Sequence, residues 1–175
     1  HADLIAGLPL YRLEEIFEDV RTCRLSGRRN SAGVPETPPG NRNAPKSRRT
    51  RYPILPDAPY EVLETREITA DELQTARQLS RLLDGFYNTP AWQGITRQLI
   101  VDHEDFLHKM LDYLIELRVI DQPLGLERRG IILYEFCQKH YPDYTCAVSR
   151  AWIEAGMSLK KQPAERVRTK HVTPP

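Results

Sequence analysis

The chain has 175 residues, of which 40% are hydrophobic, and a formal net charge of +1. This length supports one modest core, so two full domains are not expected. No uncharged apolar stretch approaches the roughly 20 residues that cross a bilayer, which excludes a transmembrane helix.

Two basic segments are concealed by the small net charge. Residues 23–51 contain eight Arg or Lys and one acid, and residues 158–175 contain five and one. The rest of the chain is therefore acidic. Residues 23–51 also hold four prolines and few apolar side chains, so burial cannot offset the entropy lost on ordering. We predict a disordered basic segment at 23–51 and a disordered basic tail at 158–175.

The first 22 residues have the pattern of a βα unit. A short apolar run, Ala2 to Ala6, predicts a strand that ends at Gly7-Leu8-Pro9. The period then changes to that of a helix, with one apolar face made by Leu10, Leu13, Ile16, Phe17 and Val20. Residues 52–68 are rich in proline and β-favouring side chains, which predicts an extended arm.

Residues 69–157 read as helices only. Thr69 and Glu72 have the spacing of a capping box, and the helix that they open continues to about Phe86. Further helices are predicted from Pro90, over about 103–118, over about 127–140, and after Pro142. The fold class is therefore mainly α, with a domain of four to five helices.

Candidate catalytic and metal-binding residues have simpler interpretations. His103 and His108 are five residues apart, whereas a zinc-protease helix needs a spacing of four. Because they would point about 140° apart, we predict solvated side chains and no metal site. The acids between 102 and 116 fall on the wet face of an amphipathic helix, so no catalytic residue is assigned. The later cysteines and aromatic residues are predicted to be core: Tyr134, Cys137, Tyr141, Tyr144, Cys146 and Trp152.

The pattern of the three cysteines indicates the cellular compartment of the protein. Cys23, Cys137 and Cys146 form no C-x-x-C pair, which predicts neither a disulfide framework nor a cysteine-only metal site. A reducing cytoplasm is favoured. The basic segments would bind any polyanion weakly, so one hypothesis is a small helical binding module with basic arms for nucleic acid or a protein partner.

Four stretches, in two regions of the sequence, support another hypothesis. Residues 3–9, DLIAGLP, resemble the strand and turn late in the barrel of radical S-adenosylmethionine (radical SAM) enzymes. Three further stretches are similar to the start of the helical C-terminal domain of cobalamin-binding radical SAM proteins, a domain with no assigned function: PYEVLET at 59–65, ITADEL at 68–73 and FYNT at 86–89.

The resemblance implies a set of cofactors and two binding residues. In related enzymes the aspartate of this strand and the second residue after it contact the cofactor, which implies Asp3 and Ile5. An ordinary strand-end acid is an equal alternative for Asp3. The C-x-x-x-C-x-x-C loop that holds the iron–sulfur cluster is absent from this sequence, as are the cobalamin domain and most of the barrel.

We therefore expect a C-terminal fragment of a cobalamin-dependent radical SAM enzyme, inactive alone and without a cofactor of its own. Its partner would be the remainder of the parent enzyme. S-adenosylmethionine, the iron–sulfur cluster and cobalamin are implied for that parent only.

The resemblance also implies another barrel strand after the helix at 11–22, of the kind LEFLKLLPGT. Read from the second base of the Asn30 codon, the codons for residues 30–41 permit I-Q-L-E-F-L-K-L-L-P-G. We hypothesise that residues 23–51 are a frame-shifted translation of such a strand. If they are a true sequence instead, the disordered segment is genuine.

Overall fold

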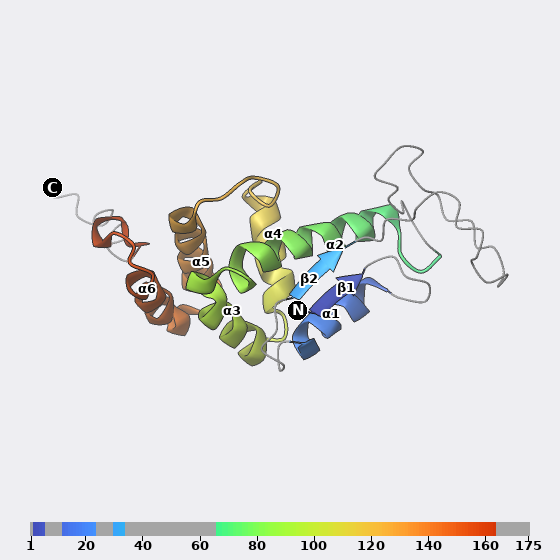
Figure 1. The fold of residues 1–175 in the computed structure, drawn as a ribbon, viewed down its shortest axis with the longest axis horizontal. Coiled ribbons are helices and arrows are strands. Elements are labelled where there is room, and N and C mark those ends of the chain that lie inside the picture. The colour runs from blue at the N-terminus through green and yellow to red at the C-terminus, as the bar shows by residue number, and fades with distance from the viewer. Residues whose placement is uncertain (1, 6–11, 24–29, 34–65, 164–175) are drawn as a thin grey trace. The chain divides into compact units, whose positions relative to one another are not determined.

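The computed structural model describes residues 2–5, 12–23, 30–33 and 66–163, and it is mainly helical (Figure 1). Its contacts divide the chain into two units, His1–Ser80 and Arg81–Pro175. The sequence predicts a boundary ahead of Thr69, whereas this division assigns residues 69–80 to the first unit. The elements are β1 (Ala2–Ile5), α1 (Leu13–Cys23), β2 (Asn30–Gly33), α2 (Ala70–Leu82), a π-helical segment (Leu83–Tyr87), α3 (Pro90–Asp102), α4 (Phe106–Glu116), α5 (Leu126–His140), α6 (Thr145–Glu154) and two short 3-10 turns (Pro142–Tyr144 and Leu159–Lys161).

The first unit contains a parallel pair of strands. β1 pairs with β2 in a register that sets Asp3 opposite Ser31 and Ile5 opposite Gly33. α1 connects the strands and packs against both, because parallel neighbours need a crossover connection. The predicted βα unit is therefore extended to β1-α1-β2.

β2 corrects one expectation from the sequence. Asn30–Gly33 lies inside the segment 23–51 that was predicted to be disordered, and for these four residues the prediction is wrong. Backbone hydrogen bonds to the edge of β1 satisfy the polar groups of a short strand whatever its side chains. The rest of 23–51, except the helical Cys23, lies outside the described residues.

The helices of the first unit each bury one face. Ile16, Phe17 and Val20 are buried on α1, as their spacing predicts. α2 opens with the predicted capping box: the Thr69 amide donates to Glu72 Oε2 at 2.7 Å, and the Glu72 amide donates to Thr69 Oγ1 at 3.3 Å. Of the arm predicted at 52–68, the structure describes only residues 66–68. Ile68 is buried.

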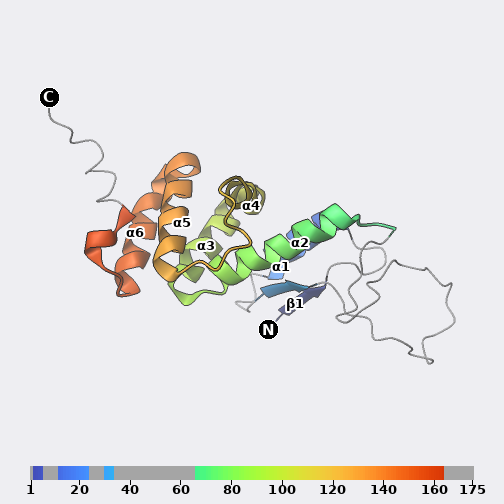
Figure 2. The same ribbon diagram turned by 90° about the horizontal axis from the view of Figure 1, so that it is seen from above.

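In the second unit, α6 packs against both α3 and α5 (Figures 1 and 2). The centre of this packing is a pair of fully buried indoles, Trp92 from α3 and Trp152 from α6, with ring centroids 6.3 Å apart. α5 crosses them at Gly130. A Cβ placed there would lie 2.5 Å from the Trp92 ring and 2.9 Å from the Trp152 ring. Only a glycine allows this close approach.

The predicted helix bounds agree with the structure to within a few residues, and the largest difference is at the start of α4. α3 continues to Asp102, and His103 ends it in an extended conformation, so α4 begins at Phe106 rather than His103.

The predicted core residues are mostly buried. Burial raises the pKa of the Cys137 thiol to about 12. Cys146 is exposed, so its assignment to the core is wrong. Val148 and Trp152, four residues apart, define the core face of α6, and Cys146 falls on the opposite side.

The start of the basic tail is ordered, which corrects the prediction of disorder for residues 158–163. The Trp152 indole donates to the Ser158 carbonyl at 3.0 Å, and Lys161 forms an ion pair with Glu127 at 2.9 Å. The hydrogen bond satisfies the buried Trp152 N–H, and together with the ion pair it fixes the chain beyond α6. Residues 164–175 lie outside the described residues.

The described helices also bear on membrane insertion. None of them combines the length and the apolar composition of a transmembrane span.

The capping box gives the first prediction. Replacing Thr69 by alanine should lower the free energy of unfolding by about 1 kcal/mol, because the Glu72 amide loses the Thr69 hydroxyl as its acceptor. Thr75 lies in the interior of α2 and donates to the Asp71 carbonyl. The matched Thr75→Ala change should cost nothing or be slightly stabilising. Urea unfolding of both variants measures the difference, and equal midpoints would contradict the role of the capping box.

The same pair predicts a pH dependence. Hydrogen bonds from the Thr69 amide and hydroxyl hold the pKa of Glu72 below its ordinary value of 4.5. A carboxyl group with a lowered folded-state pKa stabilises the fold above its ordinary pKa and loses that effect as pH falls through the lowered value. The stability gap between the wild type and Thr69→Ala should therefore be largest near neutral pH and shrink below pH 4.5.

Gly130 gives the second prediction. Gly130→Ala should destabilise the protein by about 1–3 kcal/mol, because its methyl group would overlap both indole rings. Gly94 in α3 has nothing within 4 Å of an added Cβ, so Gly94→Ala should stabilise by up to about 1 kcal/mol through helix propensity. Thermal unfolding compares the two, and a neutral Gly130→Ala would show that the indoles can move aside.

Candidate functional site

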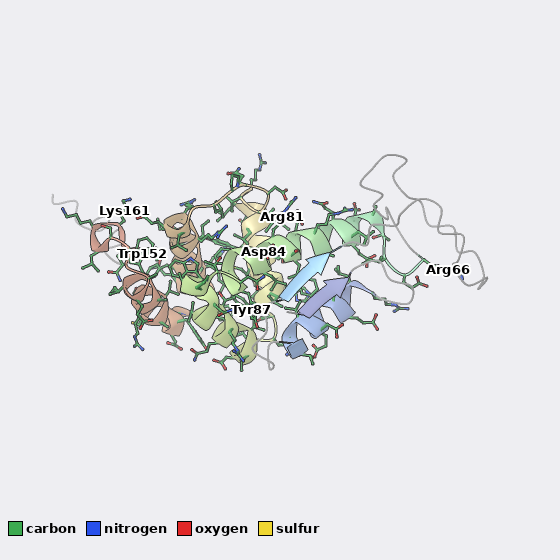
Figure 3. The ribbon with its side chains drawn as sticks, in the orientation of Figure 1. Arg66, Arg81, Asp84, Tyr87, Trp152 and Lys161 are labelled. Atoms are coloured by element: carbon green, nitrogen blue, oxygen red, sulfur yellow. The ribbon has the colours of Figure 1, made fainter. Side chains whose placement is uncertain are left out.

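A pocket of about 370 Å³ opens in the second unit beside the π-helical segment. Its walls come from the end of α2, the π-helical segment, the loop after α4 and the first turn of α5. Figure 3 labels Arg81 and Asp84, which lie on the first two of these walls. The full lining is Arg81, Asp84, Gly85, Phe86, Leu114, Val119, Ile120, Asp121, Gln122, Pro123, Leu124 and Arg129.

The π-helical segment shapes one wall. The Asn88 amide donates to the Leu83 carbonyl at 2.7 Å, five residues back, so the Asp84 carbonyl loses its usual α-helical donor. The Thr89 hydroxyl replaces that donor at 2.9 Å. The Asn88 side-chain amide also donates to Asp84 Oδ1 at 2.9 Å. These bonds fix the wide turn and hold Asp84 at the pocket.

The loop after α4 forms the opposite wall. α4 ends in a Schellman motif, in which the Val119 amide donates to the Leu114 carbonyl and the Arg118 amide to the Ile115 carbonyl. Arg118 takes the left-handed position with φ of 57°, where glycine is usual. The Gln122 side chain donates to the Arg118 carbonyl at 2.9 Å. The motif turns the chain so that Val119 and Leu114 contribute to the pocket floor.

The charges of the pocket differ in their pairing. Arg81 and Asp121 form an ion pair with each other, and both are exposed. Arg129 is half-buried and donates to the Thr89 hydroxyl at 3.3 Å. Gly85 leaves room for its guanidinium: an added Cβ would lie 3.6 Å from Arg129 Nε. Among the described residues, Arg129 forms no ion pair. The pocket can therefore bind a small molecule on an apolar floor with charged groups at its edge.

A second polar cluster joins the turn after α3 to the turn after α5. Tyr141 donates to Asp105 Oδ1 at 2.8 Å, and Tyr144 donates to Asp102 Oδ2 at 2.5 Å. His103 stacks on the Tyr141 ring with centroids 4.1 Å apart.

The electrostatics of this cluster fix its charge states. The Lys109 ammonium, 2.5 Å from Asp105, and the Tyr141 hydroxyl lower the pKa of Asp105. Burial raises the pKa of Tyr141, and the hydrogen bond to Asp102 raises that of Tyr144 to about 12. At neutral pH Asp105 is therefore charged, and the two phenols are neutral. The cluster therefore ties two turns together.

The structure places the two cofactor-binding residues implied by the resemblance in β1. Asp3 and Ile5 pair with β2 through their backbones and belong to the first unit, whereas the residues that line the pocket belong to the second.

The acidic and histidine candidates fall elsewhere. Asp102 and Asp105 join the tyrosine cluster, while Glu104, Asp112 and Glu116 are exposed, as is His108. His103 is half-buried rather than solvated. Over the described ranges, no three His, Cys, Asp or Glu side chains are close enough together to hold a metal ion.

Sequence reasoning missed the pocket. Its charged residues Arg81, Asp84 and Arg129 look like ordinary members of amphipathic helices. The only local signal was the short interval Asp121-Gln122-Pro123 with Gly125, which reads as a turn.

Residues 51–153 match the family described as "Protein of unknown function (DUF4080)". The chain belongs to this family, whose region ends with α6. The comparison with curated proteins and the comparison with solved structures gave no match.

Arg118 gives the third prediction. A side chain in the left-handed region costs about 1–2 kcal/mol, so Arg118→Gly should raise the free energy of unfolding by up to about 1 kcal/mol. Gly156 holds the same position after α6, with φ of 70°, and Gly156→Ala should lower it. Urea unfolding tests both changes. A destabilised Arg118→Gly variant would mean that the arginine side chain contributes more than its backbone costs.

Proposed function

We propose that this chain is the C-terminal region of a cobalamin-binding radical SAM enzyme. The observation that supports the proposal is the β1-α1-β2 unit, because consecutive parallel strands joined by a helix are the repeating unit of an α/β barrel. β2 lies at the position where the resemblance implies a further barrel strand. A region of the DUF4080 family follows it, from residue 51.

The iron–sulfur cluster of such an enzyme does not fit the cysteines of this chain. Three thiolates close together in sequence are needed, but burial raises the pKa of Cys137 to about 12, which keeps it a neutral thiol. Cys146 is exposed and lies in a different helix, α6. The cluster ligands would therefore belong to the rest of the parent enzyme, and the chain alone should be inactive.

Within the parent, the proposal gives this chain two tasks. β1 would present Asp3 and Ile5 to S-adenosylmethionine, and the helical region would dock on the remainder of the enzyme. The free thiols Cys137 and Cys146 are consistent with a reducing cytoplasm.

The nucleic-acid alternative gains no support from the described basic residues. Lys161 is engaged in an ion pair with Glu127, and the rest of the basic segments lies almost wholly outside the described residues.

The proposal predicts a cluster in the parent and none in this chain. Sequencing the gene upstream of the His1 codon should reveal a C-x-x-x-C-x-x-C motif, and the same read shows whether residues 23–51 are in frame. The full product, reconstituted anaerobically with iron and sulfide, should show cluster absorbance and release 5′-deoxyadenosine from S-adenosylmethionine under a reductant.

Alanine at all three motif cysteines is the matched control and should abolish both signals. Residues 1–175 alone should show neither. An upstream sequence without the motif, or a cluster bound by the 175-residue chain itself, would refute the proposal.

A further inference from the structure

The pocket beside the π-helical segment holds one positive and one negative group that do not neutralise each other. Arg81 and Asp121 neutralise each other at the rim. Arg129 has only the neutral Thr89 hydroxyl as its hydrogen-bond partner in the described part of the chain, so most of its N–H donors are unused. A half-buried guanidinium in this state favours a ligand carboxylate, which can accept two of these bonds.

The negative group is Asp84. Its Oδ1 accepts a hydrogen bond from the neutral Asn88 amide, and the carboxylate forms no ion pair with any described residue. Thr89 lies beside both residues, because its hydroxyl donates to the backbone carbonyl of Asp84 and accepts a hydrogen bond from the Arg129 guanidinium. The exposed Asp84 and the half-buried Arg129 therefore both line this pocket, and both contact the same threonine.

Half of the residues that line the pocket are apolar, and we call them its floor. Phe86, Leu114 and Val119 are buried and line it, and Ile120, Pro123 and Leu124 continue it along the loop. The volume of about 370 Å³ is at the small end of ligand pockets, which run from about 300 to 1,000 Å³. A small metabolite with one apolar arm matches this size.

We propose that this pocket binds a free amino acid with an apolar side chain. Its carboxylate binds Arg129, its ammonium group binds Asp84, and its side chain lies on the apolar floor. A simple carboxylate would leave Asp84 unpaired and facing another negative charge, and a simple amine would do the same to Arg129. Only a zwitterion satisfies both groups. This site is independent of the radical SAM proposal, because every residue that lines it lies in the second unit.

The experiment uses three probes that share an alkyl chain and differ in their charged groups. L-Norleucine carries an ammonium group and a carboxylate. Hexanoate lacks the ammonium group, and pentylamine lacks the carboxylate. Each is titrated into the ¹⁵N-labelled 175-residue chain while amide shifts are followed. L-Norleucine should shift the amides of Gly85 and Gln122, and it should bind at least tenfold more tightly than either of the other probes.

Two variants assign the charges. Arg129→Gln and Asp84→Asn should each weaken L-norleucine binding at least tenfold. Arg129→Gln should leave pentylamine binding unchanged or improved, and Asp84→Asn should do the same for hexanoate, which a general loss of structure would not produce. The matched controls Arg128→Gln and Asp112→Asn change exposed residues outside the pocket lining and should bind as the wild type does.

Three results would overturn the inference: L-norleucine binding no better than hexanoate or pentylamine, shifts confined to other parts of the chain, or wild-type affinity in both pocket variants. If a variant fails to fold, as judged by its thermal unfolding, the probe series on the unaltered chain still decides between the charge classes.

Discussion

The packing of the second unit depends on the contact between the backbone of α5 and two indole rings. Trp92 and Trp152 fill the space where α3, α5 and α6 meet, and α5 can approach only because position 130 has no side chain. A glycine in a helix interior costs about 1 kcal/mol relative to alanine. The sequence bears that cost at this one position of α5 because two large buried surfaces are gained in return.

The tryptophans also organise what surrounds them. The Trp152 indole holds the Ser158 carbonyl and so fixes the turn after α6, where Lys161 then reaches Glu127 at the start of α5. On the other side of α5 the tyrosine cluster ties its C-terminal end to the turn before α4. α5 is thus held near both ends by polar contacts and at its middle by close packing.

Much of this fold can be read from the sequence. The capping box at Thr69, the proline at the start of α3 and the two apolar rows of α4 predict helices that the structure confirms, because local backbone chemistry determines them. The predictions that fail concern segments whose structure depends on tertiary contacts. Asn30–Gly33 forms a strand because β1 offers an edge, and residues 158–163 are held by the Trp152 indole at the Ser158 carbonyl and by the ion pair of Lys161 with Glu127.

The pocket could not be predicted for a related reason. A period of 3.6 residues carries the helix from Thr69 through Phe86 without a break, and nothing in that pattern reveals the wider turn at Leu83–Tyr87. The left-handed Arg118 is equally hidden, because glycine is the usual signal of a Schellman motif and is missing here. The candidate site therefore rests on two local departures from regular helix that are visible only in three dimensions.

The close packing at Gly130 and the pocket are linked through α5. Gly130 must face the indoles, and this requirement fixes the rotation of the helix about its axis. Arg129, one residue earlier, is then turned by about 100° from that face, toward Gly85 and the Thr89 hydroxyl. The close packing at Gly130 therefore places the guanidinium on a rigid helix. A cation held this way loses little freedom when it binds a carboxylate, which is the condition under which one arginine can discriminate between small ligands.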